Sequence, residues 1–318
     1  MKNIAALVLI LLTAAESQAQ LKKVYQRAKQ AVTGSAKFSQ LHYFPEQWEM
    51  DLEAGYTYSK FNLKQTEAGL SVAEADQTSS ALNFEAKLGI LEAVYVSVDW
   101  DYVVNQELKY TKPALQPVYV SKGPAEPTFS GVWRVVDGDS VKLDGKLGYR
   151  PSFGDHNEAD GTNEGDALSG GSLIVAGGRF VALITESSQL ALVGEYGLYG
   201  VANDVDQLTN QTTENNTHGG FILQAGVLTE IISDTFFGVD VGYKHIDSYT
   251  SKNLTSQLKT ERASMDQTLL ILTAKHEFTP DMNIAGELGY LMDGRSNQGT
   301  SEIKISGYSA GARYAIRF

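Results

Sequence analysis

The chain has 318 residues, a net charge of −12 at pH 7 and a mean hydropathy of −0.20, with 30 Gly, 16 Tyr and only 7 Pro. The absence of cysteine excludes disulfides and an anchor attached through a lipidated cysteine. There is no phosphate loop, no Cys/His metal cluster and no basic, aromatic surface for nucleic acid, so the sequence predicts no cofactor, no metal and no nucleic-acid partner. The abundance of aromatic residues favours an all-β protein.

The first residues, MKNIAALVLILLTAAESQAQ, predict a secretory signal peptide over residues 1–19. Lys2 precedes a short apolar run, and small residues stand at the expected cleavage point after Ala19. The run is too short for a spanning helix, which needs about 20 residues, and no later stretch approaches that length. The sequence therefore predicts an exported protein without transmembrane helices.

Residues 20–45 form a basic extension without an acidic residue, carrying Lys22, Lys23, Arg27, Lys29 and Lys37. Two interpretations are open. The extension is either a solvated periplasmic leader or a basic segment that enters the acidic barrel described below as a partial plug, as charge complementarity would allow.

From residue 46 onward, apolar residues recur at every second position, the pattern of a strand with one apolar face. In 93–105, for example, Val96, Val98 and Trp100 alternate with Ser97 and Asp99. Twelve such segments follow in order: 46–60, 79–90, 93–105, 128–136, 140–150, 171–184, 189–201, 219–231, 235–246, 264–278, 282–292 and 303–318.

The connections between these segments alternate between short and long. Short ones lie near residue 91 and at 137–140, 186–188, 233–234 and 279–281, whereas long polar ones cover 61–78, 106–127, 151–170, 202–218, 247–263 and 293–302. Outer-membrane barrels have short periplasmic turns and long external loops. In lipid every backbone polar group must be paired, so the sheet has to close. The sequence thus predicts a closed antiparallel up-and-down transmembrane β-barrel of about 12 strands over residues 46–318.

The chain ends in GYSAGARYAIRF, in which Phe318, Ile316 and Tyr314 alternate with polar or small residues. This ending resembles the C-terminal signal of Gram-negative outer-membrane β-barrels, and FSG at 129–131 with the segment 138–155 resembles small transport-type barrels. The resemblance implies an outer-membrane location, lipid and lipopolysaccharide around the barrel, and recognition of Phe318, Ile316 and Tyr314 by the barrel-assembly machinery.

The inward faces are expected to carry charge in an uneven layout. Acidic side chains belong to the first three strands and basic ones to the fourth, the fifth and the last. In a closed barrel the last strand lies beside the first, so Arg313 and Arg317 should reach the row that begins at Glu49. The charges are either a transverse field across a water-filled lumen or mutually paired groups that fill a narrow barrel. The expected lumen-lining residues are Glu49, Asp51, Glu53, Glu85, Asp99 and Asp101 on the acidic side, and Arg134, Lys142, Lys146, Arg150, Arg313 and Arg317 on the basic side.

The function expected from these features is a porin-like channel for passive passage of small solutes. The alternatives are a closed barrel with functional external loops and, less favoured, an outer-membrane hydrolase that would use His245 or His276. No serine pairs convincingly with either histidine, so no catalytic residue is assigned. The acidic loop 154–171 is rich in oxygen ligands, but its spacing does not fit a twelve-residue calcium loop.

Overall fold

Strands with alternating apolar residues account for most of the chain, which we describe from a computed structural model. The description covers residues 40–41, 43–112, 118–155, 164–185, 187–205, 211–298 and 301–318. The expected signal peptide and all of the basic extension before residue 40 lie outside the described residues. No helix in the described part of the chain is long and apolar enough to cross a membrane.

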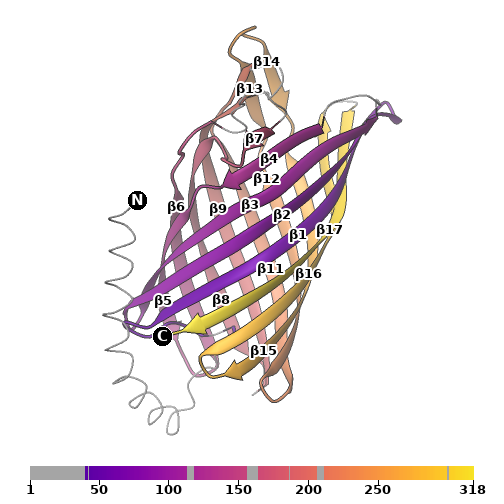
Figure 1. The fold of residues 1–318 in the computed structure, drawn as a ribbon. Helices are drawn as coiled ribbons and strands as arrows, with labels where there is room; N and C mark the ends of the chain where they lie inside the picture. The colour runs from indigo at the N-terminus through magenta and orange to yellow at the C-terminus, as the bar shows by residue number, and fades with distance from the viewer. Residues whose placement is uncertain are drawn as a thin grey trace.

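The described strands form a single sheet of seventeen, of which five are short (Figure 1). The short strands are β4 (Val118–Pro124), β7 (Glu164–Asp166), β10 (Thr212–Asn215), β13 (Tyr249–Asn253) and β14 (Lys259–Arg262). The twelve others are β1 (Met50–Glu67), β2 (Leu70–Leu91), β3 (Val94–Lys112), β5 (Thr128–Asp137), β6 (Val141–Arg150), β8 (Gly171–Leu183), β9 (Ser188–Val205), β11 (His218–Ile232), β12 (Thr235–Ile246), β15 (Met265–Thr279), β16 (Met282–Gln298) and β17 (Ser301–Arg317).

Each of the twelve long strands pairs antiparallel with its neighbour in chain order, and β17 pairs with β1. The closing seam runs from Asp51 opposite Arg317 to Glu67 opposite Ser301. Beyond the strand, the Phe318 N–H donates to the Met50 carbonyl at 2.8 Å. The predicted closed barrel of twelve strands is confirmed, and its last residue is hydrogen-bonded to its first strand.

The apolar members of each alternating pair lie on the outside of the barrel. Trp100 and Tyr314 are exposed, whereas Ser97, Ser130 and Thr273 are buried. Because only one face of each strand has to meet hydrocarbon, half of each strand is polar and the mean hydropathy stays moderate.

The hairpins at one end are longer than the sequence predicts. The expected long loop 61–78 is instead a tight turn at Ala68 and Gly69, with β1 and β2 continuing to its edge. Cross-strand polar contacts hold this extension, such as Lys64 with Glu74 at 3.4 Å. Outside the hydrocarbon neither face needs to be apolar, so the extension lacks the pattern that reveals a strand. For the same reason β16 and β17 reach into the expected loop 293–302, and β4 adds to the edge of β3.

The two ends of the barrel differ as the connection lengths predict. Short turns, such as that at Ser233 and Asp234, lie at the end where the chain terminates. The hairpin of β13 and β14 rises at the opposite end (Figure 1). Short turns face the periplasm in outer-membrane barrels. The C-terminus and the residues before β1 therefore mark the periplasmic end.

Candidate functional site

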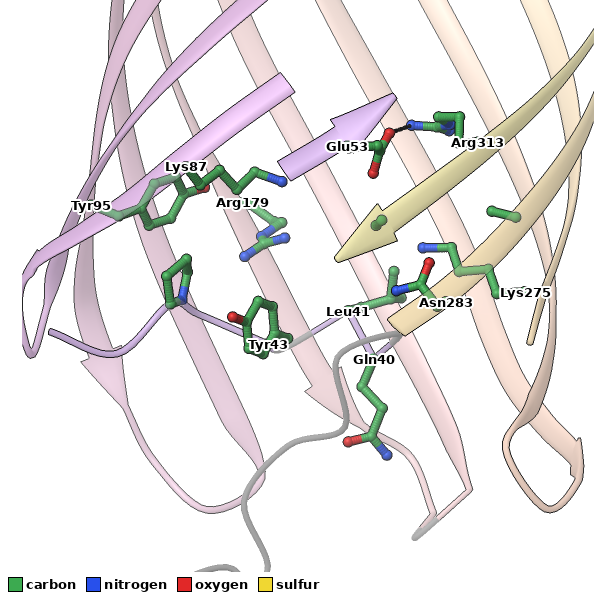
Figure 2. Close-up of a pocket in the computed structure, with 13 residues that line it drawn as sticks. Gln40, Leu41, Tyr43, Glu53, Lys87, Tyr95, Arg179, Lys275, Asn283 and Arg313 are labelled. Atoms are coloured by element: carbon green, nitrogen blue, oxygen red, sulfur yellow. Dashed lines mark hydrogen bonds and ion pairs between the residues drawn. The ribbon is translucent and has the colours of Figure 1, made fainter. Parts of the chain in front are cut away.

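The residues that precede β1 fold into the periplasmic end of the barrel (Figure 2). We call residues 40–49 the lumen segment; residue 42 lies outside the described part. The Leu41 N–H donates to Gln189 Oε1 at 2.7 Å, and Gln189 is 1% exposed. Gln189 belongs to β9, which stands halfway round the barrel from β1. The lumen segment therefore crosses the barrel from one wall to the other.

The other end of the lumen segment packs against β2. Pro45 is almost fully buried, and the Trp48 N–H donates to the Gly89 carbonyl at 2.7 Å. A Cβ at position 89 would overlap the carbonyl oxygen of Glu46, so a glycine is required for this close approach. Phe44 contacts the Tyr95 ring edge-on at 4.8 Å, which ties the segment to β3 as well.

Tyr43 lies at the centre of a polar cluster beneath the barrel seam. Its hydroxyl is 3.0 Å from Glu49 Oε2 and 3.0 Å from Asp51 Oδ1. Burial raises the pKa of Tyr43, and the two carboxylates raise it further, so the hydroxyl stays protonated and donates. Burial also raises the pKa of Glu49, although the Arg317 guanidinium 3.2 Å away opposes this change. Charge-assisted bonds of this kind fix the segment more firmly than neutral ones would.

A cavity of about 150 Å³ lies between the lumen segment and the barrel wall (Figure 2). Charged side chains from several strands point into it, which shows that these faces of the strands look inward. The cavity is lined by Gln40, Leu41, Tyr43, Pro45, Glu53, Lys87, Tyr95, Arg179, Lys275, Asn283, Ala285, Arg313 and Ala315.

Most of the charged residues expected in the lumen contact a partner of opposite charge on the inner wall or in the lumen segment. Arg313 Nη1 lies 3.0 Å from Glu53 Oε1, and its other terminal nitrogen contacts Glu287. Arg317 reaches Glu49, so both arginines of the last strand meet the acidic row of the first. The remaining pairs are Arg134 with Asp144 at 2.5 Å, Lys142 with Asp137 at 2.5 Å, Lys146 with Glu195 at 2.9 Å and Glu85 with Lys87 at 2.8 Å.

Three expected residues lie differently. Asp101 accepts a hydrogen bond from the Asn83 amide at 2.8 Å, and Asp99 lies opposite Glu85 across the β2–β3 pair. Arg150 ends β6, and its Nε is buried without a hydrogen-bond partner among the described residues. At the periplasmic half of the barrel, the contacts favour mutual pairing over a separated transverse field.

The sequence pattern did not indicate several residues of the site. Arg179 lies in a segment, 171–184, whose small residues obscure the period, and it contacts Asp144 at 2.7 Å. The segment 264–278 could be read in either phase. The structure has Leu272 exposed and Thr273 buried, which turns Lys275 inward. Gln189 gives no local signal, because its role depends on a residue almost 150 positions away.

The two histidines considered for hydrolysis contact a threonine and carboxylates. His276 Nδ1 is 2.9 Å from the Thr235 hydroxyl, and His245 contacts Asp266 at 2.7 Å and Asp247 at 3.2 Å. Within the described ranges no histidine is hydrogen-bonded to a serine hydroxyl, and no group of three or more His, Cys, Asp or Glu is placed to hold a metal ion. Part of the acidic loop 154–171 lies outside the described residues.

Comparison with solved structures agrees with this architecture. A crystal structure of the COG4313 outer membrane channel from Pseudomonas putida F1 matches with a TM-score of 0.61 and 14% identity, covering 89% of this chain and 100% of that one. The translocator domain of the autotransporter NalP from Neisseria meningitidis matches with a TM-score of 0.50 and 12% identity, covering 96% and 97%. No protein-family model and no curated protein matches the sequence.

These likenesses show the fold, and together with the outward apolar face they define the class. The protein is an outer-membrane β-barrel, with an architecture similar to that of one outer-membrane channel and of an autotransporter translocator domain. Its place is therefore the bacterial outer membrane.

Proposed function

We propose that the protein is a channel for passive passage of small polar solutes, narrowed at its periplasmic end by the lumen segment. The observation that carries this proposal is the hydrogen bond from Leu41 to Gln189, which fixes the segment across the lumen beside a charged cavity. A barrel that served only as a scaffold for external loops would have no need of such a crossing.

The charges on the wall support passage of polar solutes. The pairs Glu53 with Arg313 and Lys146 with Glu195 keep the inner surface hydrophilic while leaving little excess charge at each point. Charged and hydrogen-bonding groups along a pore set which solutes pass. The barrel has more strands than the eight-stranded barrels that side chains fill and fewer than the porins with a wide aqueous channel. The lumen segment then sets the narrowest point.

Two deletions test the proposal in planar bilayers. Removing residues 20–39 keeps the lumen segment, whereas removing residues 20–45 takes away the contacts of Leu41, Tyr43 and Pro45. We expect the shorter deletion to leave the unit conductance near that of the mature protein and the longer one to raise it. The matched pair separates the narrowing from any effect of the basic extension.

Equal conductance of both deletions would contradict narrowing by the lumen segment. Heat-modifiable migration in gels shows that each of the three proteins is folded. If none of the three folded proteins conducted ions, the channel itself would be contradicted, and a closed barrel whose external loops carry the function would be favoured.

A further inference from the structure

We propose that the cavity above the lumen segment is a binding site for a small organic carboxylate. The inference rests on the proposed function, because the ligand would reach the cavity through the lumen. It names the class of solute that the channel retains on its way to the periplasm.

The first observation is the charge of the cavity wall. Four cationic side chains and one carboxylate line it. Three of the cations are compensated: Lys87 by Glu85 at 2.8 Å, Arg179 by Asp144 at 2.7 Å, and Arg313 by Glu53 at 3.0 Å. The fourth, Lys275, has no side-chain hydrogen bond or ion pair to any described residue. Glu53, the one carboxylate in the wall, contacts Arg313 instead, and a cation turned into a cavity without a carboxylate in contact with it attracts an anion there.

The second observation is a neutral donor beside this lysine. Asn283 lies on the adjacent strand β16 and is 7% exposed, and its side chain and that of Lys275 both point into the cavity (Figure 2). The Asn283 carboxamide likewise has no hydrogen-bond partner among the described residues. An ammonium and an amide N–H side by side can each donate to one oxygen of a carboxylate.

The third observation is the size and character of the remaining wall. A cavity of about 150 Å³ holds a molecule the size of benzene. Leu41, Pro45 and the alanines Ala285 and Ala315 contribute apolar surface to the wall, and Tyr95 adds an aromatic ring. The site therefore fits a carboxylate with a compact apolar body, with the charge directed to Lys275.

Binding of benzoate and of its neutral counterpart benzamide to the mature protein in detergent, measured by isothermal titration calorimetry, tests the inference. We expect benzoate to bind and benzamide to bind at least tenfold more weakly. Lys275→Gln should weaken benzoate binding at least tenfold, and Lys275→Arg should retain most of it. The control is Lys244→Gln, because Lys244 lies on the same inner face but far from the cavity. It is roughly 26 Å along β12 from the residue that pairs with Lys275, at about 3.3 Å per residue.

Equal binding of benzoate and benzamide, equal losses in the Lys275→Gln and Lys244→Gln variants, or no benzoate binding at all would each overturn the inference. Conductance in bilayers is measured separately, so the two proposals fail separately. If the protein conducts but binds no benzoate, only the proposed carboxylate site is contradicted. If it binds benzoate but does not conduct, only the proposed channel is contradicted. Deleting residues 20–45 removes one wall of the cavity and should abolish binding.

Discussion

Arg313 shows how single residues set the local charge of the inner wall. Its guanidinium lies between Glu53 on one neighbouring strand and Glu287 on the other. A basic residue between two acidic ones keeps the local charge low, because each carboxylate would otherwise face the lumen uncompensated. This position could be predicted from the sequence, since closure brings the last strand beside the first.

If the proposed channel function holds, replacing Arg313 with glutamine should raise the preference for cations over anions. The change leaves Glu53 and Glu287 on the lumen wall without their shared cation, and the reversal potential across a salt gradient should move toward that of a cation-selective pore. Lys304→Gln is the control, because it removes the same charge from the same strand at an exposed position paired with Glu302. A reversal potential that moves equally in both variants would show that Arg313 does not act from the lumen.

At the scale of elements, the lumen segment depends on both walls of the barrel. Gly89 and Tyr95 hold it near β2 and β3, and Gln189 holds it on the opposite wall. A segment without regular secondary structure relies on such contacts, because no ladder of backbone hydrogen bonds fixes it. Loss of one contact should therefore release one end of the segment while the barrel stays intact.

Replacing Gln189 with leucine tests this dependence. The variant keeps the side-chain volume but loses the acceptor for the Leu41 N–H, a bond worth about 1 kcal/mol. We expect a higher or more variable unit conductance with little change in the free energy of unfolding. Gln224→Leu serves as the control, because Gln224 donates to Asp240 on the wall and not to the segment. A rise in conductance in both variants would argue against a specific role for Gln189.

At the scale of the whole molecule, the outer and inner faces of the barrel should respond in opposite ways to charge. Leu272 is exposed on the outer face near the middle of β15, whereas Gln224 lies on the inner face beside Asp240. Hydrocarbon solvates a cation poorly, but a polar inner wall with a nearby carboxylate accepts one.

Leu272→Arg should lower the free energy of unfolding in urea by about 2–4 kcal/mol, the cost of an arginine near the midplane of a membrane. Gln224→Arg should change it by less than about 1 kcal/mol, because the new charge lies in the lumen beside Asp240. Similar losses in the two variants would contradict the assignment of faces on which the membrane orientation depends.

The sequence predicts the strands of the barrel well, but it does not predict many of the contacts in its interior. Twelve strands could be predicted because every strand that meets hydrocarbon needs an apolar outer face, as in 93–105. The extensions of β1 and β2 beyond residue 60 could not, because strands outside the membrane need no such face. Interior partners such as Gln189 and Lys275 were missed because the inner wall imposes no period, and their roles depend on residues distant in the chain.

The arrangement of the two chain ends has a consequence for biogenesis. Phe318 is hydrogen-bonded to Met50, and Arg317 beside it contacts Glu49 and lies over the Tyr43 ring. The last two residues thus close the barrel and also contact the Glu49 end of the lumen segment. The contacts of Glu49 and Tyr43 with Arg317 can therefore form only when the last strand docks, so this end of the lumen segment becomes fixed in the same late step of assembly that closes the barrel.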